Sequence, residues 1–142
     1  MEYIHQAQYY ETDQMGVIHH SNYIRWMEEA RIFYMDQMDF PYKAVEEAGI
    51  ISPVLGVQCD YRSMTRFGDR VSIEVKMNSF NGVKYEVSYV MRDEKTREVR
   101  ATGTSRHCYL TREGRPVTVK KALPALYEKM LSMVEDGKGT EE

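Results

Sequence analysis

Residues 21–38 read S-N-Y-I-R-W-M-E-E-A-R-I-F-Y-M-D-Q-M. Apolar side chains recur along this stretch at spacings of three or four, as on one face of an α-helix, at Tyr23, Met27, Ala30, Tyr34 and Met38. The pattern predicts one helix of roughly five turns, with Ser21 or Asn22 as its N-terminal cap and Pro41 marking the break after it. Further apolar side chains widen this surface beyond a single stripe: Trp26, Ile32 and Phe33. We therefore expect a sheet wrapped around the helix.

The segments on either side of this helix supply that sheet. A first strand is expected at Ile4–Tyr10, and four runs with period-two alternation follow at Val54–Arg62, Arg70–Ser79, Val83–Asp93 and Val99–Thr111. Short loops between consecutive strands indicate an antiparallel meander. Two more helices are expected, a short one at Pro41–Ala48 that ends at Gly49 and an amphipathic one at Pro124–Val134. The chain therefore predicts an α+β fold in which one long central helix covers about five antiparallel strands.

Length and composition indicate a single globular domain. The chain has 142 residues, of which 42% are hydrophobic and 29% are charged. We expect the domain to span residues 1–135 and residues 136–142 to form a disordered tail. The apolar runs are far shorter than the roughly 20 residues that cross a bilayer, and the N-terminus lacks the pattern of a signal peptide. A cytoplasmic location is expected, with Cys59 and Cys108 as buried free thiols.

The net charge of the chain restricts the classes of partner that it is expected to bind. A net charge of −3 and a pI near 5.8 argue against a nucleic-acid partner, because such proteins usually bind through a basic surface. Any anionic ligand must therefore meet a local basic patch. Ten methionines and eleven tyrosines suit an adaptable apolar surface. Composition alone does not choose between an acyl pocket and a subunit interface.

The segment before the helix, Tyr9–Tyr23, reads Y-Y-E-T-D-Q-M-G-V-I-H-H-S-N-Y. It places an acid, a glycine turn and paired histidines just before a helix N-terminus, where free backbone N–H groups favour negative charge. A carboxylate and such N–H groups could converge on one substrate carbonyl, which is an arrangement for acyl chemistry. Asp13 is the leading candidate. The alternative is that Asp13 only organises the bend into Gly16 as an Asx-turn.

These residues resemble the active-site segment of the hotdog-fold acyl-CoA thioesterases. The resembling branch holds the 4-hydroxybenzoyl-CoA thioesterases and the acyl-CoA thioesterases encoded with the Tol-Pal system. The element order of nearly the whole chain follows this family, with specific motif support in residues 9–31 and 61–69. The resemblance implies the hotdog fold and acyl-CoA as substrate. It also implies a homo-oligomer, either a homodimer or a homotetramer built from two dimers, with active sites at the protomer interface.

The resemblance also implies catalytic roles for Tyr9, Asp13 and His20. The aspartate of the segment acts either as general base for water or as a nucleophile that forms a mixed anhydride, and here it is Asp13. The 4-hydroxybenzoyl-CoA enzymes have tyrosine where His20 stands, a departure that points away from hydroxybenzoyl substrates. Tyr9 and Tyr10 are expected in a strand, so only one of them can face the site. Core or interface packing is the alternative for either tyrosine.

Residues 16–20 are the expected contacts to the acyl group. The backbone N–H of His20 could point at the thioester oxygen, while Gly16 and Val17 allow a bend and close substrate approach. His19 is a substrate-binding candidate that could equally form local hydrogen bonds at the helix entry. Adjacent histidines are a poor metal pair, and no metal-ligand spacing accompanies them. No metal or redox cofactor is expected.

A second segment, residues 61–69, resembles the family's strand end and its G-D turn. It brings Arg62, Arg66 and Arg70 close together in sequence. Such side chains could hold the phosphates of coenzyme A by charge-assisted hydrogen bonds. The alternative for each is an ordinary solvated surface arginine.

Two other functions fit the same fold. One is an enoyl-thioester hydratase or dehydratase, which also pairs an acidic residue with a histidine but needs proton transfer at the α carbon. The spacing of Asp13 and His20 in the D-x-x-G context favours hydrolysis over this reaction. The other is a non-catalytic module that binds acyl-CoA, because fold does not fix function.

Overall fold

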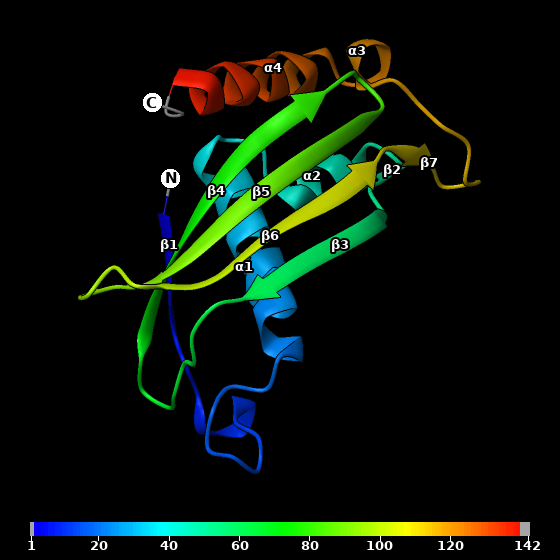
Figure 1. Ribbon diagram of the computed structural model, residues 1–142. Helices are drawn as coiled ribbons and strands as arrows, with labels where there is room; N and C mark the ends of the chain where they lie inside the picture. Colours follow the sequence, from blue (N-terminus) through cyan, green and yellow to red (C-terminus); the bar gives the residue numbers. More distant parts are fainter. Residues whose placement is uncertain (1, 140–142) are drawn as a thin grey trace.

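The computed structural model describes residues 2–139. Its main sheet is antiparallel and has the strand order β1-β4-β5-β6-β3 (Figure 1). These strands are β1 (Glu2–Gln6), β3 (Val54–Tyr61), β4 (Arg70–Phe80), β5 (Lys84–Asp93) and β6 (Val99–Cys108). A second, two-stranded sheet joins β2 (Ile50–Ile51) to β7 (Leu110–Thr111). The helices are η1 (Tyr9–Glu11), α1 (Ser21–Gln37), α2 (Tyr42–Glu47), α3 (Val119–Ala122) and α4 (Pro124–Gly139).

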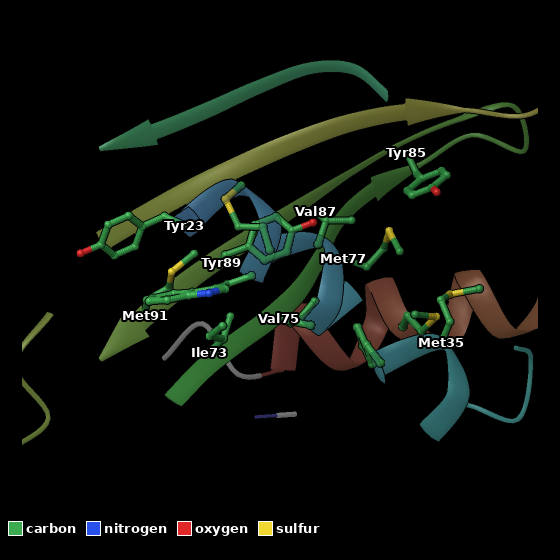
Figure 2. Close-up of a cluster of buried hydrophobic side chains, with 14 of the residues drawn as sticks. Tyr23, Met35, Ile73, Val75, Met77, Tyr85, Val87, Tyr89 and Met91 are labelled. Atoms are coloured by element: carbon green, nitrogen blue, oxygen red, sulfur yellow. The ribbon is translucent and has the colours of Figure 1, made fainter. Parts of the chain in front are cut away.

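The core lies between α1 and one face of the sheet. Alternate residues of β4 and β5 point toward α1, and Figure 2 shows the cluster that they form with the helix: Ile73, Val75, Met77, Tyr85, Val87, Tyr89 and Met91. From α1, the buried apolar side chains follow the helical period, at Tyr23, Trp26, Met27, Ala30, Tyr34 and Met35. The sheet therefore wraps around one helix, as the sequence predicts.

Gly103 explains how closely α1 approaches β6. A Cβ built at Gly103 would lie 3.0 Å from Cε of Met27 and 2.7 Å from the carbonyl oxygen of Gln58 on β3. Any side chain there would push the helix or the neighbouring strand away, because packed interiors leave no spare room. This glycine thus lets Met27 lie directly against the sheet.

Helix α4 covers the part of β4 that β1 leaves free. β1 pairs with β4 only between Arg70 and Glu74, and α4 packs against β4 (Figure 1). Its buried side chains join the main core: Leu126, Met130 and Met133. Covering an edge strand in this way removes a surface that would otherwise pair with other chains. No helix within residues 2–139 is long and apolar enough to cross a membrane.

Three local predictions were wrong. The first strand ends at Gln6 rather than Tyr10, because the chain turns into η1, where the Gln8 N–H donates to the side chain of Glu11 at 2.8 Å. The helix cap is His20, and neither Ser21 nor Asn22 caps α1 with its side chain. The meander holds only for β4, β5 and β6. β3 pairs with β6 at the far edge instead of with β4, since the longer connection of residues 62–69 permits a crossover.

The remaining predicted elements are confirmed with small shifts at their ends, except the strand expected at Val99–Thr111. That segment breaks at Tyr109 into β6 of the main sheet and β7 of the second sheet. α2 ends before Gly49, and α4 continues to Gly139, beyond the expected end at Val134. Of the predicted disordered tail, residues 140–142 lie outside the described residues. Cys108 is buried and Cys59 is half-buried, and both are free thiols. Burial raises the pKa of the Cys59 thiol.

Candidate active site

The loop between β1 and α1 is held by one buried carboxylate, Glu11. Its Oε2 accepts a hydrogen bond from the Trp26 indole N–H at 2.7 Å, and its Oε1 accepts from the Gln8 backbone N–H at 2.8 Å. The His5 ring also lies 3.0 Å from Oε1 and contacts Glu29 through its other nitrogen. Burial alone would raise the pKa of the Glu11 carboxyl, but hydrogen bonds from His5, Trp26 and Gln8 together lower it.

The backbone of Glu11 ties the same loop to the start of α1. Its carbonyl oxygen accepts from the His19 N–H at 2.8 Å and from the Asn22 side-chain amide at 2.9 Å. Asn22 therefore clamps η1 to the helix entry. The sequence alone does not point to Glu11 as part of the site. Its partners Trp26 and His5 lie on two different elements, so no local motif brings the three residues together.

Asp13 organises the turn that follows η1. Its Oδ1 accepts from the Met15 N–H at 2.8 Å and from the Val17 N–H at 3.4 Å, and its own N–H donates to the Val17 carbonyl at 2.8 Å. Gly16 completes the turn with a φ of 77°, where residues with a side chain are disfavoured. The Asx-turn expected as the alternative role is therefore present. It occupies only Oδ1, and no hydrogen bond to Oδ2 is found within residues 2–139.

The same aspartate lines a cleft of about 370 Å³ at the N-terminus of α1. Side chains from the loop, the helix and the end of β3 form its walls: Asp13, Met15, Val17, Ile18, His20, Tyr23, Tyr61, Arg62, Ser63 and Met64. Segments that are far apart in the sequence thus line the same cleft. The cleft has a volume at the lower end of those that hold small molecules.

His20 contributes a backbone donor to this cleft. It stands directly before the first residue of α1, and within residues 2–139 its N–H has no hydrogen-bond acceptor. The neighbouring N–H groups of His19 and Ser21 bind the Glu11 carbonyl and the His19 ring. The His20 amide is therefore the one of these three that remains available to a ligand. The His20 ring stacks on His19 at 4.2 Å.

Tyr23 and Tyr61 build the wall opposite the loop. The hydroxyl of Tyr61 donates to the His20 carbonyl at 3.3 Å, and that of Tyr23 donates to the buried Thr65 at 3.1 Å. Their rings are 5.3 Å apart. Burial raises the pKa of the Tyr61 hydroxyl, so it stays protonated as a donor. From the sequence, Tyr23 was expected only to pack and Tyr61 only to lie at a strand end. Their contact could not be predicted, because it depends on which strand β3 pairs with.

The other predicted site residues lie in different places. Tyr9 is 75% exposed on η1, packs against Phe67 and does not line the cleft, so the expected strand position of Tyr9 and Tyr10 was wrong. Arg62 lines the cleft, whereas Arg70 binds Glu94 at 2.9 Å, beside the turn at Gly68.

Three further candidates have clear positions. Arg66 lies next to the loop, since its backbone bridges Val17. His19 binds Ser21 through its ring and does not line the cleft, and Gly16 lies within the turn. Among the described residues, no group of three His, Cys, Asp or Glu side chains could hold a metal ion.

Comparison with known proteins assigns the chain to a family. The sequence model described as "Thioesterase-like superfamily" matches residues 8–130. The chain belongs to this superfamily. The fold is accordingly the hotdog fold that the sequence predicts. The narrower assignment to the 4-hydroxybenzoyl-CoA and Tol-Pal-associated branch stays a prediction.

Three known proteins are similar to this thioesterase-like chain. "Putative acyl-CoA thioesterase YneP" of Bacillus subtilis (strain 168) is 30% identical over 128 residues, which covers 87% of this chain and 92% of the relative. "1,4-dihydroxy-2-naphthoyl-CoA hydrolase" of Prochlorococcus marinus is 27% identical, covering 85% and 81%. The solved structure of the DHNA-CoA thioesterase from Staphylococcus aureus superposes with a TM-score of 0.90 at 27% identity, covering 99% and 94%.

Proposed function

We propose that this protein is an acyl-CoA thioesterase, which hydrolyses an acyl-CoA to a free acid and coenzyme A. The chain belongs to the thioesterase-like superfamily, and similar proteins named as acyl-CoA and DHNA-CoA thioesterases support hydrolysis of a thioester. The observation that carries the residue assignment is the position of Asp13 and the His20 amide in one cleft. A carboxylate and an unpaired N–H at a helix N-terminus are the two groups that thioester hydrolysis needs.

In the proposed reaction, the His20 N–H binds the thioester oxygen and stabilises the negative charge that develops there. The dipole of α1 favours the same charge. As general base, Asp13 takes a proton from water while the water oxygen bonds to the carbonyl carbon. The carbon–sulfur bond then breaks, and the thiolate accepts a proton. As nucleophile, Asp13 instead forms a mixed anhydride that water hydrolyses. A thiol of pKa about 8.5 leaves without a strong general acid in either case.

Coenzyme A is proposed to bind over the end of β3. Arg62 is the arginine that lines the cleft, and Arg66 lies beside it on the same segment. Their guanidinium groups suit phosphate oxygens. The ion pair between Arg70 and Glu94 makes Arg70 the weakest of the three predicted contacts. A catalytic role for Tyr9 rests on the resemblance alone and stays a prediction.

We also propose a homo-oligomer, a dimer or a dimer of dimers, that works in the cytoplasm. Within residues 2–139, β3 is an edge strand with a single neighbour, β6. Its inner face is apolar and uncovered, with Val54 52% and Val57 40% exposed. Pairing with a second copy would cover this surface and satisfy the free edge.

Replacement of Asp13 by Asn separates catalysis from turn formation. Asn keeps an oxygen that can accept from the Met15 N–H, so the turn persists while the negative charge is lost. We expect release of free thiol from a good acyl-CoA substrate to fall at least ~100-fold, within the range for loss of a general base. The matched control is Asp93→Asn, because Asp93 holds a similar turn through the N–H groups of Lys95 and Thr96.

Hydrolysis by Asp13→Asn at the parental rate would show that the residue assignment is wrong. Product analysis with an enoyl-CoA distinguishes hydrolysis from the addition of water across the double bond. Tight binding of acyl-CoA without release of thiol by the wild-type protein would instead indicate a binding module.

A further inference from the structure

A second cavity lies between α1 and the strands β3 and β6. It measures about 120 Å³ and is lined by Ile24, Arg25, Met27, Glu28, Arg31, Val54, Val57, Tyr89, Ser105 and His107. No step proposed above uses it. Its size is close to that of an apolar protein cavity of about 150 Å³ that holds one benzene molecule. A small terminal group of a ligand would fill it.

The cleft and this cavity share no lining residue, but they follow one another along α1 and β3. Tyr23 lines the cleft, and Met27, one helical turn further along α1, lines the cavity. On β3 the same order runs from Tyr61 to Val57. His20 in the cleft and Arg31 in the cavity are about 16 Å apart along the helix axis at 1.5 Å per residue. An acyl group whose carbonyl lies at His20 would extend toward Arg31.

Arg31 brings a buried positive charge to the far end. Its side chain belongs to a residue that is only 7% exposed, and within residues 2–139 no carboxylate oxygen lies within 4.0 Å of it. Burial raises the pKa of the Tyr89 hydroxyl, which lines the same cavity, to about 12, and the positive charge of Arg31 opposes that rise. Arg31 therefore lines the cavity without an anionic partner among the described residues, and a bound carboxylate would supply one.

A chain of hydrogen bonds beside Arg31 ends at the His107 ring. The Tyr89 hydroxyl lies 2.7 Å from Ser105 Oγ, which lies 2.6 Å from Nε2 of His107. Within residues 2–139, Nδ1 of His107 has no hydrogen-bond partner, although the residue is 1% exposed. Burial lowers the pKa of His107 to about 3, so the ring is neutral.

We propose that this cavity is the distal end of the acyl-binding groove and that Arg31 binds a carboxylate at the far end of an ω-carboxyacyl group. The inference rests on the proposed thioesterase function and names its substrate class. Arg31 supplies charge-assisted hydrogen bonds to the carboxylate, and Met27, Val57 and Ile24 contact the methylene chain. Glu28 at the rim forms no ion pair with Arg31, and its negative charge works against the bound anion.

The test compares acyl-CoAs of equal chain length that differ only at the far end. Wild-type kcat/KM is measured by thiol release for the dicarboxylyl-CoA, its terminal methyl ester and the fatty acyl-CoA at three chain lengths: suberyl and octanoyl, sebacyl and decanoyl, and tetradecanedioyl and myristoyl. We expect the dicarboxylyl member of at least one length to exceed both neutral analogues about ten-fold or more, the range for one hydrogen bond to a charged group. Arg31→Met should abolish this preference and Arg31→Lys should retain part of it, while Glu28→Gln should increase it.

Arg92→Met is the matched control, because Arg92 pairs with Glu74 on the outer face of the sheet, away from the groove. It should leave the preference unchanged. Hydrolysis of the neutral acyl-CoAs at rates equal to the dicarboxylyl ones by the wild-type enzyme would overturn the inference and leave the thioesterase function intact. Equal losses on all substrates in Arg31→Met, together with dissociation of the oligomer, would assign Arg31 to assembly and overturn it too. Failure to hydrolyse any acyl-CoA would overturn the proposed function itself.

Discussion

At the scale of single residues, Glu11 decides whether the loop between β1 and α1 is held in place. Replacement by Gln keeps the volume but puts an N–H₂ group against N–H donors of Trp26 or Gln8. We expect Glu11→Gln to lower the free energy of unfolding by about 1–3 kcal/mol per buried donor left unpaired, and to lower kcat because the loop also carries Asp13. Urea denaturation and thiol-release assays measure the two effects. Glu29→Gln is the control, since Glu29 is a 44% exposed partner of the same His5.

The pH dependence of Glu11 has a definite sign. Its folded-state pKa lies below the ordinary value of 4.5, so the folded protein binds this proton less readily than the unfolded chain does. The resulting stabilisation is fully present above pH 4.5 and is lost as the pH falls through the folded-state pKa. The wild-type protein should therefore lose part of its advantage over Glu11→Gln on acidification below that pH. A difference in stability that is independent of pH between 7 and 3 would contradict an ionised Glu11.

At the scale of elements, the turn before α1 depends on Gly16. Its φ is 77°, and a Cβ there would meet no atom within 4 Å. Gly16→Ala should therefore cost only backbone strain, about 1–2 kcal/mol, while shifting Asp13 relative to the His20 amide and reducing kcat. Gly114→Ala is a matched control, since Gly114 has a φ of 87° and equally open space in a turn remote from the cleft. Thermal melts should show similar losses for both variants, and only Gly16→Ala should lose turnover. Equal activity in the two would show that the turn does not position Asp13.

The elements also show what the sequence could and could not reveal. The helix α1 and the strands β4 to β6 could be predicted because their apolar periods are local properties of the chain. The pairing of β3 with β6 could not be predicted. The apolar pattern of β3 fits either edge of the sheet, and its partner strand is decided by a crossover in the chain. The η1 turn was missed because it depends on Glu11 meeting Trp26, fifteen positions later. The motif predicted that Asp13 and His20 lie near one another, and they line one cleft, whereas the positions of Tyr61 and Arg31 depend on how the sheet folds.

At the scale of the whole molecule, the groove between α1 and β3 is only half enclosed. One wall is the helix and the other is the inner face of β3, where Val54 and Val57 remain uncovered. An apolar groove beside a free strand edge suits a partner that pairs one of its strands with β3 and covers the open side of the groove. Assembly and substrate binding should therefore depend on the same surface.

This dependence predicts the effect of a charge on the edge strand. Leu55 lies at the irregularity in the pairing of β3 and is 45% exposed, so Leu55→Lys should change the stability of the single chain little. It should nevertheless weaken a dimer formed through β3, because a lysine would be buried in an apolar interface without a partner charge. Light scattering after size exclusion should show a shift toward monomer, with lower turnover at low protein concentration. Leu131→Lys on α4, also an exposed leucine at 36%, should leave the mass unchanged. If Leu55→Lys keeps the parental mass at all concentrations, the subunits associate through another surface, and the groove must be completed from there.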